Sequence, residues 1–89
     1  MSYQVKTTPR FNREFKRLDP YTQRMLKAWI EKHLVSCDNP RASGKALSAD
    51  LRGLWRYRIG DYRILCELRD AELIILALSV GHRREVYRN

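Results

Sequence analysis

The feature that most constrains the fold of this chain is a predicted β-hairpin in residues 53–68, GLWRYRIGDYRILCEL. Two strand-like runs are joined by Gly60-Asp61, and closing the hairpin at this pair sets Arg58 opposite Arg63. Side chains alternate between the two faces of a strand. One face therefore holds apolar residues suited to a core (Trp55, Tyr57, Ile64, Cys66), and the other holds three cations (Arg56, Arg58, Arg63). The hairpin thus predicts a sheet with one apolar and one cationic face.

Two helices are predicted before the hairpin. The first opens at Thr8-Pro9, because proline suits the first turn of a helix. Its apolar stripe recurs at four- and three-residue spacing (Phe11, Phe15, Leu18). The second helix has its predicted N-cap and first residue at Asp19-Pro20 and runs to about Ser36. We expect both helices to pack on the apolar face of the sheet.

The other strands differ in length and burial. Residues 2–7 alternate as a short first strand, and residues 38–53 have the composition of a loop. Residues 73–80, LIILALSV, are apolar at nearly every position, as in a central strand buried on both faces, and a tail starts at Gly81. The order strand-helix-helix-strand-strand-strand over residues 1–89 predicts one α+β domain, a mainly antiparallel sheet with two N-terminal helices on one face.

Length and cysteine content exclude several classes of protein. The chain of 89 residues suits one domain, and no apolar run approaches the ~20 residues of a membrane span. The N-terminus lacks the apolar region of a signal peptide, so we expect a cytoplasmic protein whose Cys37 and Cys66 are reduced. Neither cysteine belongs to a Cys-x-x-Cys motif or a Cys/His cluster, so no metal or other cofactor is expected.

The net charge of +8, from 18 Lys and Arg against 10 Asp and Glu, favours a polyanionic partner. Nucleic acid, the ribosome, an acidic protein and an anionic membrane surface all fit this charge. An alternative is that the excess charge only keeps the chain in solution. The common enzyme motifs are absent, since the chain has no paired-carboxylate motif, GxSxG, glycine-rich phosphate loop or HExxH.

What remains is a set of cations with one phenol, drawn from the hairpin and from the tail: Arg56, Arg58, Arg63, His82, Arg83, Arg84 and Tyr87. Two like charges directly opposite each other destabilise a strand pair, and a phosphate bound between them relieves the repulsion. Several guanidiniums can also stabilise the charge on a phosphodiester in its transition state. Arginine titrates too high to be an ordinary general base, so these residues argue for phosphate binding more strongly than for cleavage. A solvated basic face stays an alternative.

The stretch GKALSADLRGLWRYRIGDYRILCEL, followed by VGHRREVY, resembles the RelE/ParE superfamily of bacterial toxins, in particular its RelE-type branch. The resemblance implies a ribosome-dependent endoribonuclease that cuts mRNA in the ribosomal A site without a metal. The 2′-hydroxyl attacks the adjacent phosphate and leaves a cyclic phosphate and a 5′-hydroxyl end. The resemblance also implies an acidic cognate antitoxin of the RelB type, with the ribosome and mRNA as further partners and no membrane partner.

Carried over by motif, the catalytic residues of the family fall on Arg56, Arg58, Arg63, Arg83 and Tyr87, and we assign RNA contacts to Lys45, Arg52, His82 and Arg84. Founding members carry lysine at the positions of Arg56 and Arg58. A buried lysine can lose its proton and act as a base, whereas arginine hardly can. The general base is thus open between His82 and Tyr87. Two other readings also stay open, a ParE-type toxin that inhibits DNA gyrase and a non-catalytic member of the family.

Overall fold

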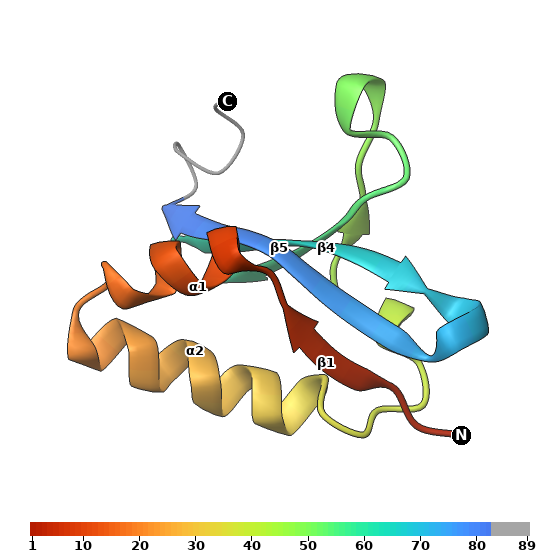
Figure 1. The fold of residues 1–89 in the computed structure, drawn as a ribbon, viewed down its shortest axis with the longest axis horizontal. Coiled ribbons are helices and arrows are strands. Elements are labelled where there is room, and N and C mark those ends of the chain that lie inside the picture. The colour runs from red at the N-terminus through yellow and green to blue at the C-terminus, as the bar shows by residue number, and fades with distance from the viewer. Residues whose placement is uncertain (83–89) are drawn as a thin grey trace.

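Five strands form one sheet in the order β1-β5-β4-β3-β2 in the computed structural model, which describes residues 1–82 (Figure 1). The strands are β1 (Gln4–Thr7), β2 (Lys45–Ala46), β3 (Trp55–Ile59), β4 (Tyr62–Arg69) and β5 (Ile74–His82). In this sheet β1 and β5 run parallel, and the other neighbours are antiparallel. The helices α1 (Pro9–Lys16) and α2 (Pro20–His33) lie together on one face of the sheet (Figure 1), which confirms the predicted α+β class.

Both helices begin where the sequence predicts, because a side-chain oxygen caps each first turn. Thr8 accepts a hydrogen bond from the Phe11 N–H at 3.1 Å, and Asp19 accepts one from the Thr22 N–H at 3.0 Å. A proline follows each cap, where its missing N–H costs nothing. The local signals therefore fix where each helix starts.

The second helix is shorter than predicted. It ends at His33, whereas the apolar pattern indicated an end near Ser36. Ser36 adopts a left-handed backbone conformation (φ 60°), and its N–H donates to the Tyr3 carbonyl at 3.2 Å. The chain thus leaves the helix to bond with the residue that precedes β1. Within residues 1–82, no helix combines the length and the apolar character needed to cross a membrane.

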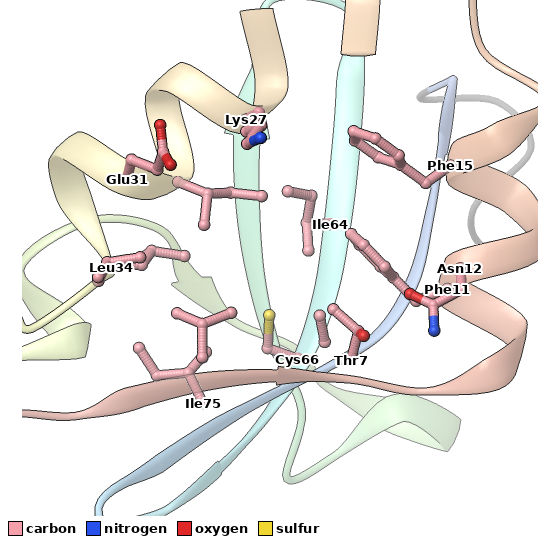
Figure 2. A pocket seen from close by; sticks show the side chains of 14 residues that line it. Thr7, Phe11, Asn12, Phe15, Lys27, Glu31, Leu34, Ile64, Cys66 and Ile75 are labelled. Carbon is pink, nitrogen blue, oxygen red and sulfur yellow. The ribbon is translucent and has the colours of Figure 1, made fainter. Parts of the chain in front are cut away.

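The core lies between the helices and the sheet. Its fully buried side chains come from α2, β3, β4 and β5 (Leu26, Tyr57, Ile64, Cys66, Ile75). Burial raises the pKa of the Cys66 thiol to about 12, so this thiol stays protonated and unreactive. An apolar cleft of about 440 Å³ opens between α2, α1 and β1, and Ile64 and Cys66 of β4 line it (Figure 2).

Two strand boundaries differ from the prediction. The first strand starts at Gln4 and not at residue 2. The last strand covers Ile74–His82 and not residues 73–80, because its pairing with β4 continues through Gly81 and His82. These two residues therefore belong to the sheet and not to a tail. As predicted, β5 is an inner strand, since it lies between β1 and β4.

A short strand lies inside the segment predicted to be a loop. Lys45–Ala46 forms β2, which pairs with β3 at the edge of the sheet. Gly44, just before it, has a left-handed φ of +87°, and a Cβ atom at this position would collide with the Arg56 carbonyl oxygen and the Trp55 indole nitrogen. The Trp55 indole N–H donates to the Ser43 carbonyl at 2.8 Å. Glycine at position 44 therefore lets β2 lie directly against β3.

Replacing Gly44 by alanine should destabilise the protein more than replacing Gly53. Both glycines have left-handed φ values (+87° and +94°), so each substitution carries a similar backbone cost, about 1 kcal/mol. A Cβ atom at Gly53 would meet no atom within 4 Å, in contrast to the collision at Gly44. We expect Gly44→Ala to lower the free energy of unfolding by about 1–3 kcal/mol more than Gly53→Ala in denaturant titrations. Equal losses in the two variants would contradict the close approach of β2 to β3.

Candidate functional site

The face of the sheet away from the helices, called the open face below, carries the hairpin arginines. The two hairpin strands pair with Arg58 directly opposite Arg63, as predicted. Tyr57 and Ile64, one position along each strand, pair with each other and are fully buried in the core. Because side chains alternate across a strand, the arginines lie on the other face. The structure thus confirms the predicted division into an apolar and a cationic face.

The strands arrange the open face in two cross-strand rows. One row runs Lys45, Arg56, Leu65, Ser79, and the next runs Arg58, Arg63, Gly81. Adjacent strands lie about 4.8 Å apart, and alternate residues lie about 6.8 Å apart along one strand. The two rows therefore gather four cations into one group, which we call the cationic patch: Lys45, Arg56, Arg58 and Arg63.

Arg63 is far more buried than an ordinary surface arginine. It is only 8% exposed, whereas Arg58 opposite it is exposed and Arg56 is half-buried. The Nη1 atom of Arg63 and the Nε atom of Arg56 are buried and find no hydrogen-bond partner among residues 1–82. A buried, unpaired cationic group costs free energy, which a bound anion would recover. Alternation predicts the face of Arg63 but not this burial.

Acidic side chains do not neutralise the cationic patch in the part of the chain that the structure describes. The ion pairs found there join Met1 to Asp38, Arg10 to Glu14, Arg41 to Asp70, and Arg69 to Glu67. Within residues 1–82 the charge of the patch is thus not neutralised, and a surface of this charge attracts polyanions. The same residues contain no group of three or more His, Cys, Asp or Glu side chains placed to hold a metal ion.

Of the predicted RNA contacts, Lys45 lies with the arginines, since it pairs with Arg56 across β2 and β3. Arg52 is exposed just after a short 3-10 turn, η2 (Ala49–Leu51), and no hydrogen bond or ion pair within residues 1–82 links it to the patch. Three predicted residues from the C-terminus lie outside the described residues (Arg83, Arg84, Tyr87). Their roles stay predictions.

His82 does not share a row with the arginines. It is the last residue of β5 and pairs with Tyr62, which in turn pairs with Ile59. The rings of His82 and Tyr62 meet edge to face, with 5.9 Å between their centroids. By alternation this row belongs to the helix side of the sheet, one position beyond Arg63. We therefore leave His82 out of the cationic patch.

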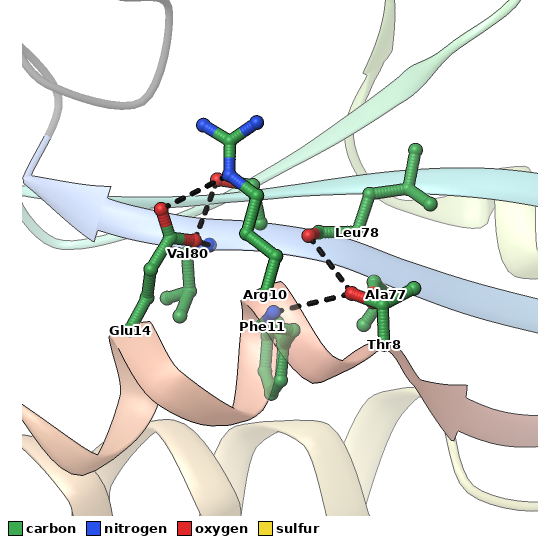
Figure 3. Close-up of polar contacts among 8 residues, drawn as sticks. Thr8, Arg10, Phe11, Glu14, Ala77, Leu78 and Val80 are labelled. Carbon is green, nitrogen blue, oxygen red and sulfur yellow. Dashed lines mark hydrogen bonds and ion pairs between the residues drawn. The ribbon is translucent and has the colours of Figure 1, made fainter. Parts of the chain in front are cut away.

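Two residues of this region were missed from the sequence. Leu65 is 6% exposed and pairs with Arg56, so it places an apolar side chain among the cations of the open face. Glu14 of α1 accepts hydrogen bonds from the Ser79 hydroxyl at 2.8 Å and from the Val80 N–H at 3.0 Å (Figure 3). The hairpin pairing already contained the signal for Leu65. No spacing along the chain indicates Glu14, because its partners lie 65 and 66 residues away.

The chemistry of the patch suits phosphate groups. A guanidinium presents paired N–H donors that match two phosphate oxygens. The facing pair Arg58 and Arg63 can bind one phosphate, and Lys45 with Arg56, about 6.8 Å along the strand, can bind a second. Arginine stabilises negative charge but does not accept a proton near neutral pH. The arginines of the patch are thus suited to binding phosphate and stabilising negative charge, and not to accepting a proton.

Comparison with known proteins identifies the family. The family model of the ParE toxin of type II toxin-antitoxin systems matches residues 5–87. Toxin RelG of Mycobacterium tuberculosis is 33% identical over 89 residues, which cover 99% of each chain. A chain in the crystal structure of the RelBE2 toxin-antitoxin complex from the same species superimposes with a TM-score of 0.79 at 25% identity, covering 93% of this chain and all of that one.

The fold recurs in more distant structures. A chain of the intact E. coli RelBE toxin-antitoxin complex matches with a TM-score of 0.69 at 17% identity, covering 91% of this chain and 96% of that one. The same sheet and helix pair thus persist where little sequence is shared. With the family model matching nearly the full length, and a relative one-third identical over the whole chain, this protein belongs to the RelE/ParE superfamily of type II toxin-antitoxin toxins.

Proposed function

We propose that this protein is an endoribonuclease toxin that cleaves mRNA on the ribosome. The observation that carries the proposal is the facing pair Arg58 and Arg63, in which the buried Nη1 atom of Arg63 has no partner among residues 1–82. Such a costly local arrangement is expected at a functional site, where a bound anion relieves it. The resemblance to RelE-type toxins indicates that this anion is a phosphodiester of mRNA.

In the proposed reaction, the 2′-hydroxyl oxygen attacks the adjacent phosphorus while the bond to the 5′-oxygen of the next nucleotide breaks. The products are a 2′,3′-cyclic phosphate and a 5′-hydroxyl end. Arg58 and Arg63 hold the nonbridging oxygens and stabilise the charge that builds on them. The 2′-hydroxyl proton must pass to a base, and the leaving oxygen must gain a proton. We assign the proton transfer to Tyr87 and a further cationic role to Arg83.

We further propose that an acidic antitoxin is the partner of the inactive protein. The matched structures from M. tuberculosis and E. coli are complexes of a toxin with its antitoxin. The net charge of +8, and a cationic patch that no acidic side chain of residues 1–82 neutralises, favour an acidic polypeptide over a neutral one. The same charge favours the ribosome and mRNA once the antitoxin is absent.

The family model that matches is that of ParE toxins, which favours a second candidate function. The ParE-type branch inhibits DNA gyrase and lacks the catalytic set, as the resemblance implies. A protein of this kind would bind its target without cutting RNA. The four cations of the patch favour the ribonuclease, because closely spaced cations can bind successive phosphates of an RNA backbone.

The deciding experiment is cleavage of a defined mRNA by the purified chain. The mRNA is presented on programmed ribosomes and, as a control, free of ribosomes, and new ends are mapped by primer extension. We expect cuts within the A-site codon, with 5′-hydroxyl ends, only in the ribosome-bound sample. If neither sample is cut and DNA supercoiling by gyrase is inhibited instead, the ParE-type alternative is correct.

Arg63→Met should make the protein more stable and less active. The change removes a buried guanidinium whose Nη1 atom has no hydrogen-bond partner among residues 1–82. Methionine replaces it with an apolar side chain of similar length. We expect the free energy of unfolding to rise by about 1 kcal/mol. The lost phosphate contact should lower kcat for mRNA cleavage about 100-fold.

Arg69→Met is the matched control for this variant. Arg69 lies on the same strand and the same face but is exposed and pairs with Glu67 at 3.2 Å. Surface ion pairs contribute little, so stability and kcat should both stay near the wild-type values. Arg63→Met unfolding more easily than Arg69→Met would show that Arg63 supports the fold and does not strain it.

Tyr87→Phe should lower kcat with little change in KM, because it removes one hydroxyl and keeps the aromatic ring. His82→Gln should leave kcat and its pH dependence nearly unchanged, since the His82 ring packs against Tyr62 in the row that faces the helices. Profiles of kcat against pH for both variants distinguish the two residues. An inflection near neutral pH that vanishes in His82→Gln would assign the proton transfer to His82.

A further inference from the structure

A β-bulge in β5 sets the alternation of the last residues of that strand. Ala77 of β5 pairs with Cys66 of β4. Ser79 pairs with Leu65, the residue just before Cys66, so Leu78 lies between two paired residues and has no partner on β4. One extra residue in a strand turns every later side chain to the face opposite the one it would otherwise take. The bulge therefore decides which residues after it complete the rows of the open face.

The start of α1 holds the outer edge of β5 at this bulge. Among the described residues, β1 ends beside Ala77. Beyond this point α1 lies along the edge of β5 that β1 leaves free (Figure 3). The Thr8 N–H donates to the Ala77 carbonyl at 3.1 Å, and the Thr8 hydroxyl lies 3.0 Å from the carbonyl oxygen of the bulged Leu78. Since the same hydroxyl oxygen caps α1 through the Phe11 N–H, it couples the helix to the bulge.

Glu14, in the second turn of α1, holds the residues just after the bulge. One carboxylate oxygen accepts hydrogen bonds from the Ser79 hydroxyl at 2.8 Å and the Val80 N–H at 3.0 Å, and the other accepts one from Arg10 Nε at 3.2 Å. Burial alone would raise the pKa of the Glu14 carboxyl, but the three donors hold that pKa below its usual value. The carboxylate thus stays ionised near neutral pH and keeps both bonds to β5.

We propose that Thr8 and Glu14 are positioning residues for the cleavage site: they hold the bulge at Leu78 and so keep Gly81 beside Arg63 on the open face. The inference rests on the proposed ribonuclease function, in which Arg83 and Tyr87 act in catalysis. His82 ends β5, and Arg83 follows it directly in the chain. A slip of one residue after the bulge would turn Gly81 away from Arg63 and bring His82 onto the open face.

Glu14 is suited to this role because its contacts do not support the core. The buried contact of α1 with the core is made by Phe11, which is 4% exposed. Glu14 is half-buried, and its hydrogen bonds run to Ser79, Val80 and Arg10. Loss of its carboxylate would leave the core intact but would free the Val80 N–H at the strand edge. The expected damage is therefore local to the end of β5.

The test compares three substitutions of Glu14 with one control. Glu14→Ala removes the acceptor, Glu14→Asp keeps the charge but shortens the side chain by one methylene, and Glu14→Gln keeps an acceptor oxygen at full length. The control, Glu31→Ala, removes the same charge from an exposed position on α2. For each variant we would measure amide hydrogen exchange at Val80, the melting temperature, and kcat and KM for cleavage of ribosome-bound mRNA.

We expect Glu14→Ala and Glu14→Asp to speed exchange at Val80 and to lower kcat, each about tenfold, because an unsatisfied buried N–H costs free energy of that order. KM should change little. Glu14→Gln and Glu31→Ala should keep exchange and kcat near the wild-type values. The rescue by glutamine is the sharpest result, since a role of the charge alone would leave Glu14→Gln as impaired as Glu14→Ala.

Unchanged exchange or unchanged kcat in Glu14→Ala would overturn the proposal, as would a glutamine variant no better than the alanine variant. If Glu14→Ala does not fold, Glu14→Asp carries the same comparison. Cleavage by the wild-type chain separates the proposed function from the positioning role of Glu14. A wild-type chain that cuts no ribosome-bound mRNA refutes the proposed function, whereas equal cleavage by wild type and Glu14→Ala refutes only the positioning role.

Discussion

The cationic face of the sheet depends on one constraint, the pairing of Arg58 directly opposite Arg63 across the hairpin. Gly60 takes a left-handed conformation (φ 59°) that closes the turn and fixes the register of β3 against β4. The burial of Tyr57 and Ile64 locks this register, because a slip of one residue would put the arginines in the core. The strands therefore cannot slide to relieve the repulsion between the two guanidiniums, whereas an anion bound between them would relieve it.

Charged side chains form ion pairs where they support the fold. Within residues 1–82 they have no such partners where we propose function. At the far end of the sheet, Asp70 accepts hydrogen bonds from the Tyr3 hydroxyl at 2.7 Å and from two guanidinium nitrogens of Arg41 at 3.0 Å each. The Arg41 guanidinium, with help from Tyr3, holds the pKa of the Asp70 carboxyl below its usual value. No such partner meets Arg58 or Arg63 within residues 1–82. The contrast separates a structural ion pair from the surface at which we propose binding.

The parts of the fold that could be predicted from the sequence depend on neighbours a few positions apart. The hairpin register follows from Gly60-Asp61, and each helix start follows from a cap and the proline after it. The parts of the fold that could not be predicted depend on contacts between residues far apart in the chain. The strand β2 forms because Gly44 can lie against β3, and Glu14 finds its partners across 65 and 66 residues of chain. The burial of Arg63 is likewise a property of the assembled sheet.

The two outermost strands of the sheet are short, which limits how a second chain can pair with the sheet edges when no partner covers them. An exposed edge strand is a template on which another chain can add its own strand, which is how many β-proteins aggregate. Here one edge is β2, only two residues long and led by Lys45, and the other is β1, four residues long. Neither offers a second copy much backbone to pair with. The fold that displays a cationic face thus also limits the addition of a strand from a second copy at β1 or β2.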